Sequence, residues 1–222
     1  MRQLIIFGDS VIKGVQHCDG KFHLCPDHDF ASLQSIGMEA HNYAKMGATI
    51  ETGLSIMQRR LSVCAPGTTV LLSFGGNDCD YNWAEIAAAP DAEHLPHTPP
   101  ERFTELYRQA IRLVRDCGAE PVAASIVPLE AERYWRVISN GLNGENIMQW
   151  LGDVHHLYRW QEYYNYLACS AAASMGCRLI DVRSHFLRQP RFSEFMSDDG
   201  IHPSEQGHAL VHQILADALR EN

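Results

Sequence analysis

Five short apolar segments, separated by stretches with helical periodicity, constrain the fold of this chain more than any other feature. The segments with strand character are 2–7, 39–43, 68–74, 121–127 and 178–182. The stretches with helical character are 30–36, 50–61, 100–117, 155–175 and 204–219. Strands that alternate with helices in this way predict an α/β fold with a mostly parallel sheet. Because these elements use most of the 222 residues, we expect a single domain over 1–222.

Two stretches do not follow this alternation. Residues 79–99 carry three prolines, and residues 129–153 carry three glycines. Both follow the carboxyl ends of predicted strands, where open α/β sheets bind ligands, so we expect two long active-site loops. Their aromatic side chains either wall a pocket or pack the loops onto the domain. These side chains are Tyr81, Trp83, Tyr134, Trp135 and Trp150.

The charge and the apolar segments exclude several classes of protein. The formal net charge is −9 and no run of Lys or Arg is present, so a nucleic acid would be repelled. No stretch of about 18 apolar residues offers a membrane span. The apolar segment 4–7 is too short for a secretory signal, and the expected location is therefore cytoplasmic.

No cofactor or metal is expected either. The seven cysteines form no CxxC pair and are expected to be reduced thiols. Three histidines, His17, His23 and His28, lie close to two of these cysteines in the sequence. Their spacing does not match the regular pattern of a zinc site. Neither a GxGxxG nor a GxxxxGK[ST] phosphate loop is present, which argues against a nucleotide or flavin.

Polar residues at predicted strand ends have the composition of an acyl-transfer site. Such a site needs a hydroxyl nucleophile, a base within hydrogen-bond reach, and a group that fixes the tautomer of the base. Ser10 follows the first strand, and His202 precedes the last helix. The carboxylate that orients His202 is either Asp199, three residues before it, or the neighbouring Asp198.

Stabilisation of an oxyanion requires hydrogen-bond donors aimed at it. The side-chain amide of Asn77, after the third strand, and the backbone N–H of Ser10 are candidates. A glycine after the second strand offers a backbone N–H without a Cβ in the way. Gly47 has the better local spacing for this role, and Gly53 is the alternative.

Taken together, four motifs resemble the conserved blocks of the SGNH (GDSL-type) hydrolase superfamily, in the same order and over nearly the whole chain. These motifs are Gly8-Asp9-Ser10, Gly47, Gly75-x-Asn77-Asp78 and Asp199-x-x-His202. The first block continues with Val11 where the family name has leucine, which is a conservative change.

The resemblance implies a three-layer, flavodoxin-like fold with a five-stranded parallel sheet. It also implies that Ser10 is the nucleophile, that Asp199 and His202 complete the triad, and that Ser10, Gly47 and Asn77 form the oxyanion hole. The function expected on this basis is a serine-dependent hydrolase of a small-molecule ester that needs no cofactor.

Among ester substrates, the expected location and the absence of a large apolar loop favour a short acyl group, such as that of an acetylated carbohydrate. A lysophospholipase or thioesterase type of acyl hydrolase is the alternative, as is a non-catalytic binding module on the same fold. Acyl transfer to another alcohol uses the same triad.

Several other polar residues are expected to have structural or solvent-exposed roles. Asp9 is expected to shape the turn through backbone hydrogen bonds. Arg133 and Arg136 are expected to be solvent exposed. The helical histidines are also expected to be exposed; these are His155, His156, His208 and His212.

Overall fold

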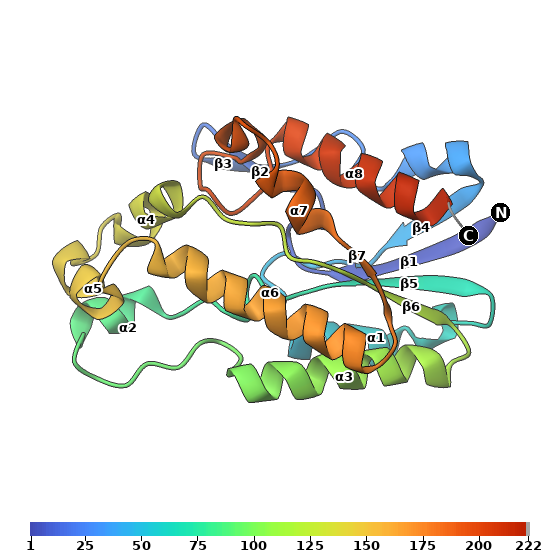
Figure 1. Ribbon diagram of the computed structural model, residues 1–222, viewed down its shortest axis with the longest axis horizontal. Coiled ribbons are helices and arrows are strands. Elements are labelled where there is room, and N and C mark those ends of the chain that lie inside the picture. The colour runs from blue at the N-terminus through green and yellow to red at the C-terminus, as the bar shows by residue number, and fades with distance from the viewer. Residues whose placement is uncertain (221–222) are drawn as a thin grey trace.

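A five-stranded parallel sheet forms the centre of the computed structural model, which describes residues 1–220 (Figure 1). Its strand order is β4-β1-β5-β6-β7, and each neighbouring pair is parallel. The strands are β1 (Arg2–Gly8), β4 (Met38–Asn42), β5 (Thr68–Ser73), β6 (Glu120–Ala124) and β7 (Arg178–Ile180). The predicted α/β class with a five-stranded parallel sheet is therefore confirmed.

Both faces of the sheet are covered, which explains why its strands read as continuous apolar runs. In β1, Leu4 and Ile6 belong to one hydrophobic core. Ile5 and Phe7, which point to the opposite face, belong to the other.

Helices form a layer on each side of the sheet (Figure 1). On one face lie α1 (Ile50–Arg59), α3 (Pro100–Asp116) and α6 (His156–Ser174). On the other face lie the 3-10 helix η1 (Ala31–Ile36), α7 (Val182–Leu187) and α8 (Glu205–Arg220). Two further 3-10 turns, η2 (Leu61–Val63) and η3 (Phe192–Phe195), connect these elements. No helix within residues 1–220 is long and apolar enough to cross a membrane.

A lobe of three short helices extends beyond the carboxyl ends of the strands (Figure 1). These helices are α2 (Trp83–Ala88), α4 (Ala131–Ser139) and α5 (Gly144–Leu151). The stretches expected as loops are thus partly helical. Side-chain caps from Glu130 and Asn143 start α4 and α5, and a third hydrophobic core holds the lobe together.

A two-stranded antiparallel hairpin, β2 (Val15–Cys18) with β3 (Lys21–Leu24), was not expected from the sequence. Its turn is Asp19-Gly20, and both residues have positive φ, at 52° and 70°. This is the geometry of a type I′ turn, which Asp-Gly favours. The hairpin residues are mostly polar or exposed, so they lack the apolar alternation that would have revealed them.

The expectation that His208 and His212 are exposed is wrong. They are 2% and 8% exposed, on the face of α8 that packs against the rest of the protein. His208 Nε2 donates to the carbonyl of Val15 at 2.8 Å, and His212 Nδ1 lies 2.9 Å from an oxygen of Asp27. These bonds tie α8 to the segments that follow β1.

Gly53, the alternative glycine for the oxyanion hole, has a packing role inside α1. It is buried, and a Cβ at this position would overlap the ring of Phe74, which is itself 1% exposed. The glycine lets α1 approach the end of β5 closely.

We expect Gly53→Ala to destabilise the protein although alanine is the better helix former. The gain in helix propensity is about 1 kcal/mol, whereas overpacking a filled core costs about 1–3 kcal/mol. Chemical unfolding measures the difference, and Gln58→Ala on the exposed side of α1 is the matched control. A Gly53→Ala variant as stable as the wild type would contradict the packing role.

His208 is expected to make the fold sensitive to acid. Burial lowers its pKa from 6.5 to about 4, against the opposing hydrogen bond to Val15. The unfolded chain therefore takes up a proton at a higher pH than the folded one. The stability contributed by neutral His208 is present above pH 6.5 and is lost as the pH falls toward 4.

In His208→Gln this loss, about 3 kcal/mol for such a pKa difference, is expected to be absent. The glutamine amide can still donate to Val15. The free energy of unfolding of both proteins between pH 7 and pH 4 provides the test, because other titrating groups act equally in both and cancel in the difference. Parallel curves for the two proteins would contradict the assignment.

Candidate active site

The structure brings Ser10, His202 and Asp199 together, although most of the chain separates Ser10 from the other two. His202 Nε2 lies 2.8 Å from the Ser10 hydroxyl, and His202 Nδ1 lies 2.6 Å from Asp199 Oδ2. All three side chains are buried, at 7%, 4% and 3% exposure in the order Ser10, His202, Asp199. This is the geometry of a nucleophile, a base and an orienting carboxylate.

The geometry separates the two candidate aspartates. Asp199 faces His202, and its second oxygen accepts the backbone N–H groups of Ile201 and His202, each at 3.1 Å. Asp198 is exposed and points toward the hairpin, where its carboxylate accepts the backbone N–H of Asp19 at 3.2 Å.

Hydrogen bonding fixes the charge of Asp199 and the tautomer of His202. Burial by itself would raise the pKa of Asp199, but the hydrogen bond and charge of His202, with the two backbone N–H groups, outweigh it and hold the pKa below its ordinary value. An ionised carboxylate only accepts, so Nδ1 carries the proton. The lone pair of Nε2 then faces the hydroxyl of Ser10, which donates to it.

Asp9, next to Ser10, shapes the turn as the sequence predicted. Its Oδ1 accepts the backbone N–H of Val11 at 3.0 Å. Burial raises the pKa of Asp9 to about 6, against the opposing effects of the Val11 amide and the charge of His202.

Asp78 holds the neighbouring loop in place. It accepts the backbone N–H of Ile50 at 3.0 Å and the hydroxyl of Thr98 at 2.7 Å, and so ties the end of β5 to the start of α1. Burial raises its pKa to about 7, although both of these hydrogen bonds act in the opposite direction.

Asn77 lies half-buried at the same strand end and lines a pocket with Ser10. Its amide nitrogen donates one hydrogen to the carbonyl of Ala48 at 3.3 Å. A side-chain amide has two donor hydrogens, so the second remains for a ligand.

Gly47 occupies a tight turn after β4. Its φ is 72°, and the N–H of Ala48 bonds to the carbonyl of Lys45 at 3.1 Å across the turn. Positive φ at the third residue is the requirement of a type II turn. Within residues 1–220, no protein acceptor takes the backbone N–H of Gly47 or of Ser10.

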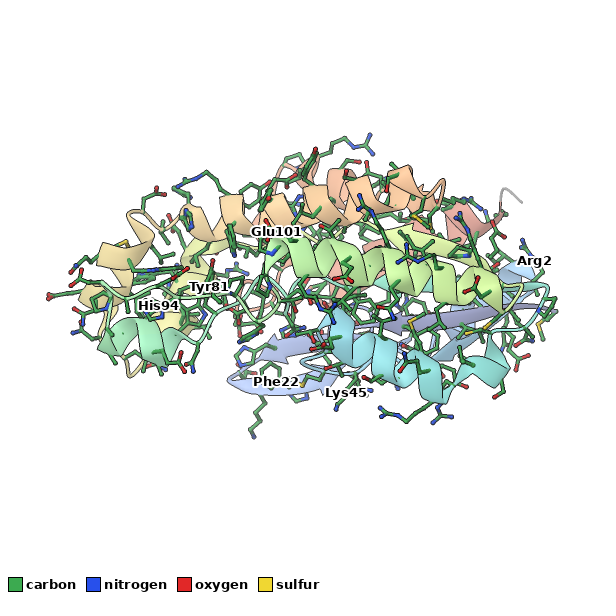
Figure 2. All side chains as sticks on the ribbon, turned by 90° about the horizontal axis from the view of Figure 1, so that it is seen from below. Arg2, Phe22, Lys45, Tyr81, His94 and Glu101 are labelled. Atoms are coloured by element: carbon green, nitrogen blue, oxygen red, sulfur yellow. The ribbon has the colours of Figure 1, made fainter. Side chains whose placement is uncertain are left out.

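A pocket runs from Ser10 and His202 into the lobe of α2, α4 and α5. It is mostly apolar and aromatic, and its volume, open mouth included, is about 830 Å³. Of the aromatic residues singled out in the sequence, three line it: Tyr81, Trp83 and Tyr134. Trp135 and Trp150 instead pack against the third core. Figure 2 shows Tyr81 in this lobe, away from the body of the sheet.

His156 lines the same pocket and is half-buried, in contrast to its expected exposure, whereas His155 is exposed.

Arg136 is exposed as expected. Arg133 is partly buried and donates to the carbonyls of Met196 and Ser197 at 2.8 and 3.1 Å, which supports the segment before His202.

Phe22, on the hairpin, was not recognised from the sequence. Its ring meets the ring of His202 edge-on, with centroids 5.6 Å apart, while 55% of Phe22 stays exposed. Figure 2 shows it at the tip region of the hairpin. The Asp19-Gly20 turn is the sequence signal that would have found the hairpin.

A metal site is not apparent in the described part of the chain: residues 1–220 contain no group of three or more His, Cys, Asp or Glu side chains placed to hold an ion.

Solved structures of several proteins have the same fold. A lipase/acylhydrolase from Enterococcus faecalis is 18% identical, with a TM-score of 0.71 over 100% of this chain and 96% of that one. An acetyl xylan esterase is 20% identical, with a TM-score of 0.63 over 98% and 99%. An acetyl-xylooligosaccharide esterase from Geobacillus is 13% identical, with a TM-score of 0.67 over 97% and 93%. At these identities the similarity shows the fold alone.

Sequence comparison identifies the family. No curated protein sequence matches the chain. The model of the GDSL-like Lipase/Acylhydrolase family matches residues 6–210, which is nearly the whole chain. The resemblance to SGNH hydrolases is therefore confirmed, and the chain belongs to the GDSL-like lipase/acylhydrolase family.

Proposed function

We propose that this protein is a serine-dependent carboxylic ester hydrolase that acts through an acyl-enzyme. The observation that carries the proposal is the continuous hydrogen-bond chain from Asp199 through His202 to the hydroxyl of Ser10. The hydroxyl also lines the mostly apolar pocket that runs into the lobe of α2, α4 and α5.

In the first step, Ser10 attacks the ester carbonyl while Nε2 of His202 takes the proton of the hydroxyl. The resulting imidazolium is stabilised by the buried, ionised carboxylate of Asp199. His202 then protonates the departing alkoxide, and the acyl group stays on Ser10. Water attacks the acyl-enzyme with His202 again as the base, and His202 gives this proton to the Ser10 oxygen as the acid leaves.

The negative charge that develops on the carbonyl oxygen needs donors that are not already used. The backbone N–H of Ser10, the backbone N–H of Gly47 and the second amide hydrogen of Asn77 fulfil this condition. We assign these three groups to the oxyanion hole. Every group in this mechanism belongs to the chain itself, so no cofactor is needed.

The substrate is proposed to be a small ester with a short acyl group. The acetylated carbohydrate expected from the sequence agrees with two proteins of the same fold, an acetyl xylan esterase and an acetyl-xylooligosaccharide esterase. Hydrolysis of longer acyl esters or thioesters uses the same triad, and a chain-length series of substrates separates these options.

We expect Ser10→Ala to lower the turnover of p-nitrophenyl esters by at least about 10³-fold, because the nucleophile is lost. The measurement is a series of esters from acetate to decanoate with the wild type, Ser10→Ala and Ser55→Ala. Ser55 is on α1, where its hydroxyl bonds only to the carbonyl of Glu51, so the control variant should keep the wild-type rate. Activity that survives in Ser10→Ala would overturn the proposal.

Asp199→Asn is expected to lower kcat by about 10³- to 10⁴-fold, because an amide that donates to Nδ1 would stabilise the wrong tautomer of His202. Asp198→Asn is the matched control and should change kcat less than twofold, since Asp198 faces the hairpin. Steady-state kinetics and a thermal unfolding curve of each variant provide the test. The opposite ranking of the two variants would show that the triad is assigned to the wrong aspartate.

A further inference from the structure

The pocket beside Ser10 contains a carboxylate that the proposed mechanism does not use. Asp80 lines the pocket, and the aromatic side chains of Tyr81, Trp83, Tyr134 and Trp160 are also part of the lining. Its Oδ1 accepts the indole N–H of Trp83 at 2.8 Å and the hydroxyl of Tyr134 at 2.6 Å. Both donors are neutral, so they orient the carboxylate without neutralising it.

No positive side chain compensates this charge. Within residues 1–220, Asp80 is in no ion pair, and no residue donates to its Oδ2. The pocket lining contains no Lys or Arg. Its remaining basic group outside the triad is His156, whose pKa is lowered by burial and by the charge of Arg159, which favours the neutral form.

Two other polar side chains of the lining, Trp160 and Gln161, form hydrogen bonds within the protein. The indole N–H of Trp160 donates to the carbonyl of Cys79 at 2.8 Å. Gln161 donates to the carbonyl of Val127 at 3.1 Å and accepts from Arg183 at 3.0 Å.

A compact ammonium group fits these constraints. A quaternary ammonium has no N–H that needs a partner, it is attracted to aromatic rings, and it supplies a positive charge opposite Asp80. We propose that the wall of Asp80, Tyr81, Trp83, Tyr134 and Trp160 binds an ammonium group of the substrate, so that esters carrying a cationic group are preferred over neutral esters of the same shape. This inference rests on the proposed ester hydrolysis and names the class of substrate.

The test compares two acetate esters that differ only in charge. Acetylcholine has a quaternary nitrogen where 3,3-dimethylbutyl acetate has a quaternary carbon. For the wild type we expect kcat/KM to be roughly tenfold or more higher for acetylcholine, mainly through a lower KM. Asp80→Asn keeps an oxygen that accepts from Trp83 and Tyr134, and in this variant the ratio should fall to about threefold or less.

Two controls make the result specific. Glu93→Gln removes a charge from the exposed segment after α2, outside the pocket lining, and should keep the wild-type ratio. Tetramethylammonium binding, measured by calorimetry, gives a readout without turnover. We expect it to be weaker for Asp80→Asn than for the wild type and equal for Glu93→Gln.

The outcomes separate this inference from the proposed function. If p-nitrophenyl acetate is hydrolysed in a Ser10-dependent way but the two acetates have equal kcat/KM, the ammonium site is wrong and the esterase stands. A preference that survives in Asp80→Asn also overturns the ammonium site. If no ester is hydrolysed, the esterase proposal fails, and the calorimetric comparison alone decides whether the pocket binds a cation.

Discussion

The pairing of β1 with both β4 and β5 determines where Ser10, Gly47 and Asn77 lie in the candidate site. In a parallel sheet the carboxyl ends of neighbouring strands lie at the same edge, so the segments after β4, β1 and β5 emerge side by side. Backbone bonds continue this order beyond the strands: Lys45 donates to the carbonyl of Gly8 at 3.0 Å, and Asp9 donates to that of Ser73 at 3.2 Å. The turns that carry Gly47, Ser10 and Asn77 are thereby fixed relative to one another before any side chain is considered.

His202 comes from outside the sheet and is held by a separate set of bonds. The backbone N–H of Ser197 donates to the carbonyl of His202 at 2.8 Å, and the Ser197 hydroxyl donates to that of Pro203 at 2.8 Å. The same hydroxyl oxygen accepts the backbone N–H of His17, on the hairpin, at 3.1 Å. The segment 197–203 is therefore a closed turn fastened to the hairpin, which keeps Nε2 at hydrogen-bond distance from Ser10. Its geometry depends on contacts between distant parts of the chain.

This difference explains what the sequence could and could not predict. The strands follow from apolar runs, and the motifs around Ser10, Asn77 and His202 indicate a shared sheet edge. The choice between Asp198 and Asp199 needs side-chain directions, which local residue types do not encode; only the family resemblance favoured Asp199.

The burial of His208 was missed because a histidine carries no apolar signal, and its carbonyl partner lies in a hairpin far along the chain. The lobe helices were missed because the prolines and glycines near their ends are typical of loops, and the residues that cap the helices were therefore not recognised.

Two carboxylates near Ser10 illustrate how surroundings assign different tasks to the same functional group. Asp199 is buried against His202, so its charge is matched by a group of the protein that becomes positive during the proposed reaction. Asp80 is bonded only to the neutral hydrogens of Trp83 and Tyr134, in a wall without cations. Asp80 is half-buried, and a cationic ligand in the pocket would supply the opposite charge that no Lys or Arg of the lining provides. In the proposed mechanism the triad accounts for bond cleavage, and in the proposed ammonium site the lobe selects the ester that is brought to it.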